Sequence, residues 1–320
     1  MSEIDNREVV LQVDHLTKDY GYGRGVFDVS IKVHKGECYG YLGPNGAGKS
    51  TTIRHIMGFA KPTKGKITIF GQETFNNTDK ILQRVGYLPG EPSLPAGLDG
   101  MGFLRMMQDM RGERNDERLN YLLKLFALDP HVNVKEMSLG EKRKLAVVAA
   151  FMNDPDVLIL DEPTSGLDPV MQAVFISFIR DEKKRGKTIL LSSHIFSEVD
   201  ATCDTISIIK DGVHVSTFKA SDLKSRTTVT FRFTFADKEN LQKFLDTKKK
   251  EGEVVEVNEK RLFATVSFDR KKYKKFLDSL DGIRVVGFEE VPFTLQDYFM
   301  SFYKEEKDFG GLGGVKGNAK

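Results

Sequence analysis

The segment Gly43–Thr51 reads GPNGAGKST and constrains the fold of this 320-residue chain more than any other feature. It satisfies the pattern G-x-x-x-x-G-K-[ST], in which glycines let successive backbone N–H groups point inward at phosphate oxygens. The apolar run Cys38–Leu42 before the loop predicts a short strand, and Lys49–Met57 after it predicts a helix. A strand, a glycine loop and a helix in this order are the beginning of a P-loop α/β domain.

The residue types in this loop divide the chemistry of phosphate binding between them. Lys49 brings a full positive charge near the β- and γ-phosphates, and Ser50 offers its hydroxyl to Mg²⁺. The helix that follows aims its positive N-terminus, roughly half a charge, at the same phosphates. The loop therefore predicts a site for the phosphates of a nucleotide bound together with Mg²⁺.

Two adjacent carboxylates close a second apolar run. The sequence VLILDEP at Val157–Pro163 predicts a buried parallel strand that ends at Asp161 and Glu162. Because neighbouring side chains there point in different directions, Asp161 can face Mg²⁺ while Glu162 faces an attacking water molecule. Adjacent carboxylates repel unless cations offset them, and Mg²⁺ and Lys49 would supply that charge. The alternative is that Asp161 only caps the next helix, and the phosphate loop makes that interpretation unfavourable.

Two further groups have a structural as well as a functional interpretation. In EMSLGEKRK, at Glu136–Lys144, Ser138 opens a predicted helix with Gly140 in its first turn. Ser138 is a good N-cap, and a helix N-terminus with a free hydroxyl is also an anion site. His194 follows the apolar strand Thr188–Leu191, where it could hydrogen-bond a phosphate oxygen or hold a water molecule. Taken alone, Ser138 indicates a capped helix and His194 a structural histidine.

The remaining pattern predicts two domains. Residues 1–220 form the P-loop core, with an antiparallel β subdomain around Val9–Val13 and Val26–Val33 and an inserted helical subdomain at about residues 99–152. Asp211-Gly212 between two strand-like runs predicts a hairpin turn. Other elements expected in this domain are the strands Lys66–Phe70, Arg84–Leu88 and Thr205–Ile209 and the helices Met171–Lys184 and Ile195–Cys203.

The second predicted domain is a C-terminal α+β extension at residues 221–304. Its apolar pattern gives the order β-α-β-β-α-β, which is ferredoxin-like. The tail 305–320 lacks periodicity and is predicted to be disordered. The expected elements are Thr227–Thr234, Asn240–Lys249, Val254–Val257, Leu262–Phe268, Lys271–Leu280 and Ile283–Phe288, with a further helix near Thr294–Tyr303.

Bulk composition excludes several classes of protein. Hydrophobic residues make up 40% and charged residues 29% of the chain, as in soluble globular proteins. The net charge of +2 demands neither a nucleic acid nor an anionic membrane as partner. The two cysteines form no CxxC pair and suit a reducing cytosol. The amino terminus lacks a signal pattern, and the longest apolar runs reach about 8 residues, far below the ~20 of a membrane helix. We therefore expect any membrane role to come from docking.

Five motifs in a fixed order resemble one family. GPNGAGKST, MSLGEKRK, VLILDEP, SGLD at Ser165–Asp168 and SSH at Ser192–His194 resemble the nucleotide-binding subunits of ABC transporters over roughly Val9–Ser221. The likeness is closest to single-domain subunits of bacterial multidrug- or antibiotic-export systems, whose extension looks like Thr227–Tyr303. The resemblance implies ATP and Mg²⁺ as cofactors and a head-to-tail dimer, with itself or a sister ATPase subunit, around two ATP molecules. It also implies a separate membrane-spanning permease as partner, a peripheral location of this chain at the cytoplasmic face of the cell membrane, and no nucleic-acid partner.

The resemblance also implies a role for each matching residue. Tyr20 matches the aromatic residue that stacks on adenine, Asp161 the Mg²⁺ carboxylate and Glu162 the general base. His194 matches the switch histidine, and Asp168 matches the loop that links the two ATP sites. The residues that match the Walker A loop are Gly43, Pro44, Asn45, Gly46, Ala47, Gly48, Lys49, Ser50 and Thr51. Those that match the signature, which contacts ATP on the opposite subunit, are Ser138, Leu139, Gly140 and Glu141.

The signature departs from the family pattern. It usually reads LSGGQ, whereas here Leu139 replaces the first glycine and Glu141 replaces the glutamine. Ser138 and Gly140 remain and can still make the anion contact. We expect the carboxylate of Glu141 to weaken that contact, because it brings a like charge near the phosphate.

A second departure lies in YLPGEP. Family members usually carry a glutamine where Gly90 stands, and that glutamine senses Mg²⁺ and water. Glycine has no side chain for this task, and Glu91 is the candidate substitute. In the family, the junction at Tyr87–Leu98 forms the groove that receives a short helix of the membrane subunit.

Three functional hypotheses follow from these residues. The first is an ATPase that powers an exporter. The second is a relative acting on ribosomes or DNA, which the single Walker A loop and a gap of about 90 residues without heptads disfavour. The third is a regulatory module that holds ATP without turnover, which Glu162 and His194 disfavour.

Overall fold

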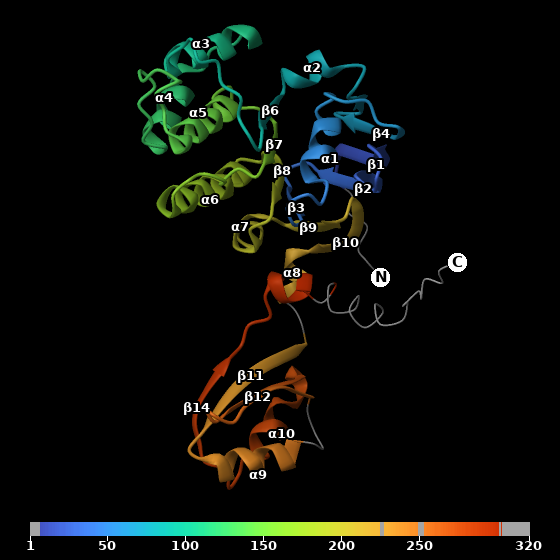
Figure 1. The fold of residues 1–320 in the computed structure, drawn as a ribbon, viewed down its shortest axis with the longest axis vertical. Coiled ribbons are helices and arrows are strands. Elements are labelled where there is room, and N and C mark those ends of the chain that lie inside the picture. The colour runs from blue at the N-terminus through green and yellow to red at the C-terminus, as the bar shows by residue number, and fades with distance from the viewer. Residues whose placement is uncertain (1–6, 225–226, 249–252, 301, 303–320) are drawn as a thin grey trace, which may run out of the picture. The chain divides into compact units, whose positions relative to one another are not determined.

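The fold consists of two compact units, Met1–Ala220 and Ser221–Lys320. The computed structural model describes residues 7–224, 227–248, 253–300 and 302 (Figure 1). Each unit contains its own cluster of buried apolar side chains, one built on the strands of the first unit and one on the phenylalanines of the second. Each unit therefore has a core of its own.

A ten-stranded mixed sheet forms the first unit. The strands lie in the order β5-β4-β1-β2-β10-β9-β3-β8-β7-β6. The pairs β1–β2, β1–β4 and β4–β5 are antiparallel and make the antiparallel subdomain that the sequence predicts. The strands are β1 (Val9–Asp19), β2 (Gly25–His34), β3 (Cys38–Leu42), β4 (Lys64–Ile69), β5 (Gln72–Glu73), β6 (Val85–Leu88), β7 (Val157–Asp161), β8 (Thr188–Ser193), β9 (Thr205–Lys210) and β10 (Val213–Lys219).

The parallel part of this sheet brings the predicted motifs to one edge. β3 pairs in parallel with β8 and β9, and β7 pairs in parallel with β6 and β8. Every residue of β3, β7 and β8 is buried, which explains the apolar runs within them, such as Val157–Leu160 and Ile189–Leu191. The register places Leu42 opposite Ser193 and Asp161 opposite Ser192. The strand ends that precede the glycine loop, the two carboxylates and His194 are therefore neighbours, at the edge where ligands bind in open α/β sheets.

The hairpin predicted at Asp211-Gly212 is present between β9 and β10, which pair antiparallel. Both turn residues have positive φ, 49° at Asp211 and 76° at Gly212. That combination belongs to the type I′ turn, which favours Asp-Gly. The turn matters for function because both residues line the cavity beside the glycine loop.

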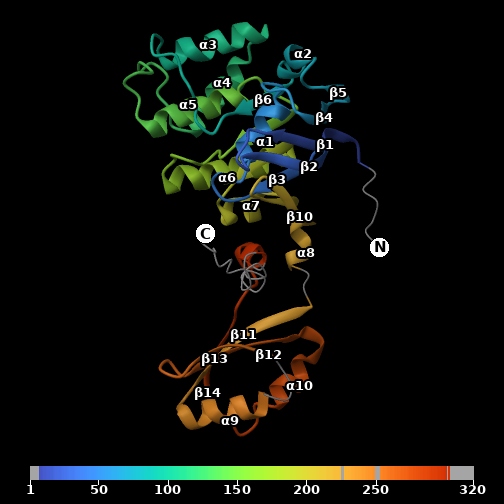
Figure 2. The same cartoon turned by 45° about the vertical axis from the view of Figure 1, so that its right-hand side comes forward.

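Helices cover the sheet and form a lateral arm. α3 and α4 both contact α5, and the three gather to one side of the strands, as the helical subdomain was predicted to do (Figures 1 and 2). Phe151 of α5 packs edge-on against Phe178 of α6 at 4.9 Å between ring centroids. The helices of this unit are α1 (Lys49–Ile56), α2 (Thr78–Leu82), α3 (Gly100–Arg111), α4 (Asp116–Leu125), α5 (Leu139–Phe151), α6 (Pro169–Lys184) and α7 (Phe196–Thr202).

The second unit is a four-stranded antiparallel sheet in the order β12-β13-β11-β14. Its elements follow the predicted order β-α-β-β-α-β, with helical residues 295–300 after them. α8 (Ala220–Lys224), which the sequence pattern missed, precedes them. The others are β11 (Thr228–Phe235), α9 (Lys238–Lys248), β12 (Glu253–Asn258), β13 (Phe263–Asp269), the 3₁₀ turn Arg270–Lys272, α10 (Tyr273–Asp278) and β14 (Val285–Glu290).

Phenylalanine rings hold the helices of the second unit on one face of its sheet. Phe233 of β11 lies 5.8 Å from Phe244 of α9 and 5.4 Å from Phe276 of α10. Phe276 also stacks on Phe268 of β13 at 4.0 Å. The predicted disordered tail, 305–320, lies outside the described residues. Among the helices that the structure describes, none is both long and apolar enough to cross a membrane.

Candidate nucleotide site

The loop Gly43–Thr51 has a backbone that requires glycine. Gly48, the residue before α1, has a φ of 104°, and a Cβ there would lie 2.7 Å from Cγ1 of Val26. A Cβ on Gly43 would lie 2.4 Å from the carbonyl oxygen of Ile209. No side chain caps the start of α1. Its first N–H groups are therefore free to bind an anion, as the sequence predicts.

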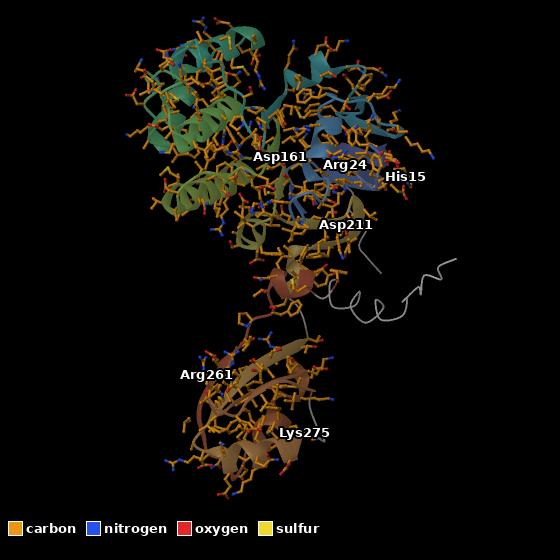
Figure 3. The ribbon with its side chains drawn as sticks, in the orientation of Figure 1. His15, Arg24, Asp161, Asp211, Arg261 and Lys275 are labelled. Atoms are coloured by element: carbon orange, nitrogen blue, oxygen red, sulfur yellow. The ribbon has the colours of Figure 1, made fainter. Side chains whose placement is uncertain are left out.

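A cavity of about 580 Å³ opens over this loop. It combines segments far apart in sequence: the β1–β2 connection, the loop, Glu162 and the β9–β10 turn. Figure 3 labels two wall residues: Arg24, which the sequence analysis did not single out, and Asp211, which it named only as part of a hairpin turn. The lining residues are Tyr20, Gly23, Arg24, Gly25, Asn45, Gly46, Gly48, Lys49, Ser50, Thr51, Glu162, Asp211 and Gly212.

Glu162 joins two predicted site residues. One of its carboxylate oxygens lies 3.0 Å from Nζ of Lys49, and the other lies 2.7 Å from Nδ1 of His194. Lys49, which is only 4% exposed, also donates to the carbonyl oxygens of Gly43 at 2.8 Å and Pro44 at 3.0 Å. The loop lysine, the second carboxylate and the strand-end histidine therefore form one contiguous group beside the cavity.

Asp161 occupies the neighbouring position and has different partners. It is 3% exposed and accepts a hydrogen bond from the Ser192 hydroxyl on β8. Asp161 caps no helix, so the capping alternative is wrong. The N-cap of α6 is Asp168, which accepts from the N–H groups of Val170 and Met171, each at 3.0 Å. Burial and the nearby Asp161 charge raise the pKa of Tyr87 to about 12, so the tyrosine stays neutral beside this carboxylate.

The donors near Asp161 fit a magnesium ion of the kind that nucleotides bring with them. Mg²⁺ prefers oxygen ligands and is held by one or two protein groups together with substrate phosphates. Asp161 supplies a buried carboxylate and Ser50, at the start of α1, a hydroxyl beside the cavity. Among the described residues, no group of three or more His, Cys, Asp or Glu side chains could hold a metal ion alone. The fit therefore depends on phosphate oxygens that complete the set.

Gly90 lies directly against Asp161, the carboxylate proposed to bind Mg²⁺. A Cβ built on Gly90 would be 3.2 Å from Oδ2 of Asp161. Glu91, the candidate substitute for the missing glutamine, is exposed. The two residues therefore differ: Gly90 faces the site through its backbone alone, and the side chain of Glu91 is open to solvent.

The signature residues lie outside the cavity. Ser138 caps α5 in a capping box with Glu141, which confirms the N-cap prediction. The Ser138 hydroxyl is not free, however, because it donates to Glu141 Oε2 at 2.7 Å, and Glu141 also accepts from the Ser138 N–H at 2.8 Å. The expectation of a free hydroxyl was wrong, because glutamate at this position closes the box. Leu139 projects into solvent and is 72% exposed.

A second cavity of about 590 Å³ lies where the sheet meets the helical arm. Side chains from β6, the following loop, α3 and α5 contribute to it, so it corresponds to the junction at Tyr87–Leu98. Its lining is mainly apolar. The lining residues are Phe59, Asp79, Leu82, Gln83, Val85, Tyr87, Pro89, Pro92, Ser93, Leu94, Phe103, Met107, Met110, Arg111, Ala146, Ala149 and Ala150.

Known proteins resemble this chain over most of its length. A model of the ABC transporter family matches residues 26–165. The bacitracin transport ATP-binding protein BcrA of Bacillus licheniformis is 33% identical over 299 residues, which cover 91% of this chain and 96% of that protein. The chain belongs to the ABC transporter family. The resemblance to its ATP-binding subunits, found from five motifs, is thereby confirmed.

Two further proteins support this membership, and a third shares the fold. The Nod factor export ATP-binding protein I of Cupriavidus pinatubonensis is 34% identical over 219 residues, 67% of each chain. The solved structure of an ATP-binding subunit of an ABC transporter superposes with a TM-score of 0.63 at 32% identity, covering 67% of this chain and 92% of that one. A dimeric ATP-binding cassette in a post-hydrolysis state, bound to ADP and Pi, shares the fold at 22% identity and a TM-score of 0.58.

Proposed function

We propose that this chain is the ATP-binding and ATP-hydrolysing subunit that powers an ABC transporter, most simply an exporter. Residues 1–220 are the ATP-binding domain, and residues 221–304 are an accessory domain. The observation that carries the proposal is the contact of Glu162 with both Lys49 and His194, beside the cavity over the glycine loop. A binding module without turnover has no need of a carboxylate placed in this way.

Nucleotide binding follows from the cavity. The N–H groups of the loop and the start of α1, together with Lys49, hold the phosphates. Tyr20 is half exposed on the cavity wall, where its ring can stack on adenine. Mg²⁺, held by Asp161 and Ser50, would offset the charge of the phosphates when bound. Without a nucleotide, the Lys49–Glu162 contact keeps the buried lysine paired.

The hydrolytic step uses Glu162 as a general base. Arrival of the phosphates gives Lys49 a stronger anionic partner, so one oxygen of Glu162 is released toward the cavity. His194 keeps its contact with the other oxygen and thereby fixes the orientation of the carboxylate. Glu162 then orients a water molecule and accepts its proton as the water attacks the γ-phosphorus. The bond from that phosphorus to the oxygen bridging the β- and γ-phosphates breaks, and ADP leaves with the bridging oxygen.

The signature residues act on a second ATP-binding subunit. Ser138 and Leu139 are exposed at the start of α5, and neither lines the cavity over the glycine loop of the same subunit. A head-to-tail dimer would place this helix start against the ATP of the opposite subunit, with Asp168 linking the two sites. Solved cassettes of the same fold form dimers, which supports this arrangement. The second subunit is another copy or a sister ATPase.

The transport partner is a separate membrane-spanning permease, to which this chain binds peripherally at the cytoplasmic face of the cell membrane. The apolar cavity between the sheet and the helical arm, about 590 Å³, fits a short helix from that partner. Bacitracin transport and Nod factor export, named for two relatives, favour export. No nucleic acid is required by this arrangement.

The proposal is tested by Glu162→Gln. The variant should bind Mg-ATP and retain it, because the amide keeps the shape of the side chain but is no base. The ATP sandwich then persists, so we expect an ATP-dependent dimer on gel filtration. The double variant with Lys49→Ala is the control and should stay monomeric. A Glu162→Gln variant that remains a monomer in saturating Mg-ATP contradicts the dimer.

A further inference from the structure

Arg143, the fifth residue of α5, is buried beneath the nucleotide site. It stands in the charged run EKRK, and its neighbours Lys142 and Lys144 are partly exposed, yet Arg143 is only 2% exposed. A fully buried guanidinium is costly unless every donor finds an acceptor. The reason for its burial is therefore to be found in its hydrogen bonds.

All five N–H groups of the guanidinium have a backbone carbonyl as acceptor. Nη1 donates to Pro89 O at 2.5 Å and to Gly90 O at 3.0 Å. Nη2 donates to Asp161 O at 3.0 Å and to Glu162 O, and Nε donates to Pro163 O at 3.0 Å. Five donors are the full complement of arginine, so none is left over. The acceptors belong to two segments, 89–90 and 161–163, that are far apart in sequence.

The second of these segments has a backbone that needs support. Glu162 has a φ of 48°, in the left-handed region that side chains other than glycine rarely adopt. Such residues persist only where surrounding contacts hold them. Three consecutive carbonyls, those of Asp161, Glu162 and Pro163, converge on Arg143. Arg143 therefore contributes to the backbone conformation that directs the Glu162 carboxylate to the cavity.

The first segment depends on Arg143 for a different reason. Gly90 has no side chain with which to read the site, and its Cα faces the Asp161 carboxylate. The distance between this loop and Asp161 is therefore set by the position of the loop backbone and not by a side chain at position 90. Arg143 binds both the loop and the Asp161–Pro163 segment, so one side chain sets their separation.

The charge of Arg143 persists in this position. Burial lowers the pKa of the guanidinium to about 10, while Asp161, Glu198 and Glu162 act in the opposite direction. Arg143 is therefore protonated at neutral pH, and its positive charge lies beneath the two adjacent carboxylates. The charge offsets part of their mutual repulsion before any nucleotide binds.

We propose that Arg143 is a positioning residue for the proposed ATP hydrolysis, tying α5 to both backbone segments that face the reacting phosphate. The N-cap of α5 is Ser138, the residue that the proposed function assigns to the ATP of the opposite subunit. A displacement of α5 then moves Glu162 and the Pro89–Gly90 loop together. The inference rests on the proposed function and adds a mechanical link to it.

The test is Arg143→Lys, with Arg143→Met as the more severe variant. Lysine keeps the charge but has three donors on one atom, so it cannot reach both segments. We expect kcat for ATP to fall by roughly 10²-fold, the cost of a displacement of about 1 Å, with KM within about threefold. Backbone amides of residues 91–98 should exchange hydrogen faster, while those of residues 45–51 should not change.

Arg118→Lys is the matched control. Arg118 is a largely buried arginine of α4, with 12% of its side chain exposed, that pairs with Glu182 at 2.6 Å instead of with either segment. The Arg118→Lys variant should have a lower unfolding temperature, and its kcat should stay within about twofold of that of the unaltered chain. The proposal is overturned if folded Arg143→Lys keeps kcat within about twofold, if kcat falls only in step with stability as in the control, or if the variant is not recovered folded. An unaltered chain without ATPase activity instead overturns the proposed function.

Discussion

At the scale of single residues, Lys49 and Glu162 form an ion pair at the edge of the cavity. The contact of 3.0 Å neutralises a lysine that is 4% exposed and a carboxylate next to Asp161. In the proposed function, ATP binding exchanges this partner for phosphate. Glu162 is then released from Lys49 and can act as the base.

Glu198 provides a prediction about pH. It is 1% exposed on α7 and accepts from the Ser193 hydroxyl at 2.5 Å, next to His194. Burial raises the pKa of the Glu198 carboxyl to about 7. The folded state therefore binds this proton more tightly than the unfolded state does. The stability that protonated Glu198 contributes is fully present below the unfolded pKa, about 4.5, and is lost as the pH rises to about 7. Thermal unfolding of the chain and of Glu198→Gln measures this contribution. The chain should lose stability relative to the variant over this range and not above it; a constant difference contradicts the assignment.

Site residues that belong to motifs of fixed spacing could be predicted from the sequence. Residues whose role depends on partners far away in the sequence could not. Lys49, Glu162 and His194 were named from their motifs, and the structure brings them together. Arg143 was missed because a charged run on a helix usually faces solvent. Ser192 was named only as part of a motif, and its bond to Asp161 depends on the register of β7 and β8.

At the scale of elements, the start of α5 carries one of the two departures from the family pattern. Glu141 closes the capping box and keeps the Ser138 hydroxyl occupied. The pKa of the Glu141 carboxyl is lowered by the bonds from the Ser138 side chain and backbone, so it is negative at neutral pH. A phosphate that approaches this helix therefore meets a negative charge as well as a helix N-terminus.

Glu141→Gln should tighten the ATP-dependent dimer. The amide oxygen can still accept from Ser138, so the cap is kept while the like charge is removed. In the Glu162→Gln background, we expect dimerisation at several-fold lower ATP, measured by sedimentation velocity across an ATP titration. Glu136→Gln is the control for net charge, because it removes an exposed negative charge just before the helix. It should change the ATP concentration needed for dimerisation only a little. Equal or weaker dimerisation of Glu141→Gln counts against a phosphate contact at this helix.

Long apolar elements were predictable, and short polar ones were not. The buried strands β3, β7 and β8 and the helices of the arm follow from continuous or periodic apolar patterns. α2 and α8 have five residues each and were missed, because so short a segment shows no helical period. α6 begins at Pro169, two residues before the predicted start, because Asp168 caps it and proline suits the first turn.

At the scale of the whole molecule, the two units have separate cores. The core of the first unit is built from β1–β4, β6–β9, α1 and α2, and that of the second from β11, β13, α9 and α10. Deleting residues 227–320 should therefore leave a folded first unit that binds Mg-ATP with unchanged affinity. Circular dichroism and calorimetric titration of the truncated chain measure both properties. Loss of nucleotide binding in a folded truncated chain would show that the second unit contributes to the site.

The measurement that tests the central claim most directly is the steady-state release of phosphate from Mg-ATP by the purified chain. We expect turnover that requires Mg²⁺, is abolished in Lys49→Ala, and falls by roughly 10²–10⁴ in Glu162→Gln, the usual contribution of a positioned base. Lys187→Ala, which removes another largely buried lysine paired with Asp154, should keep the rate of the unaltered chain. Absence of hydrolysis in the unaltered chain, or hydrolysis by Lys49→Ala at the parental rate, contradicts the assignment of this site.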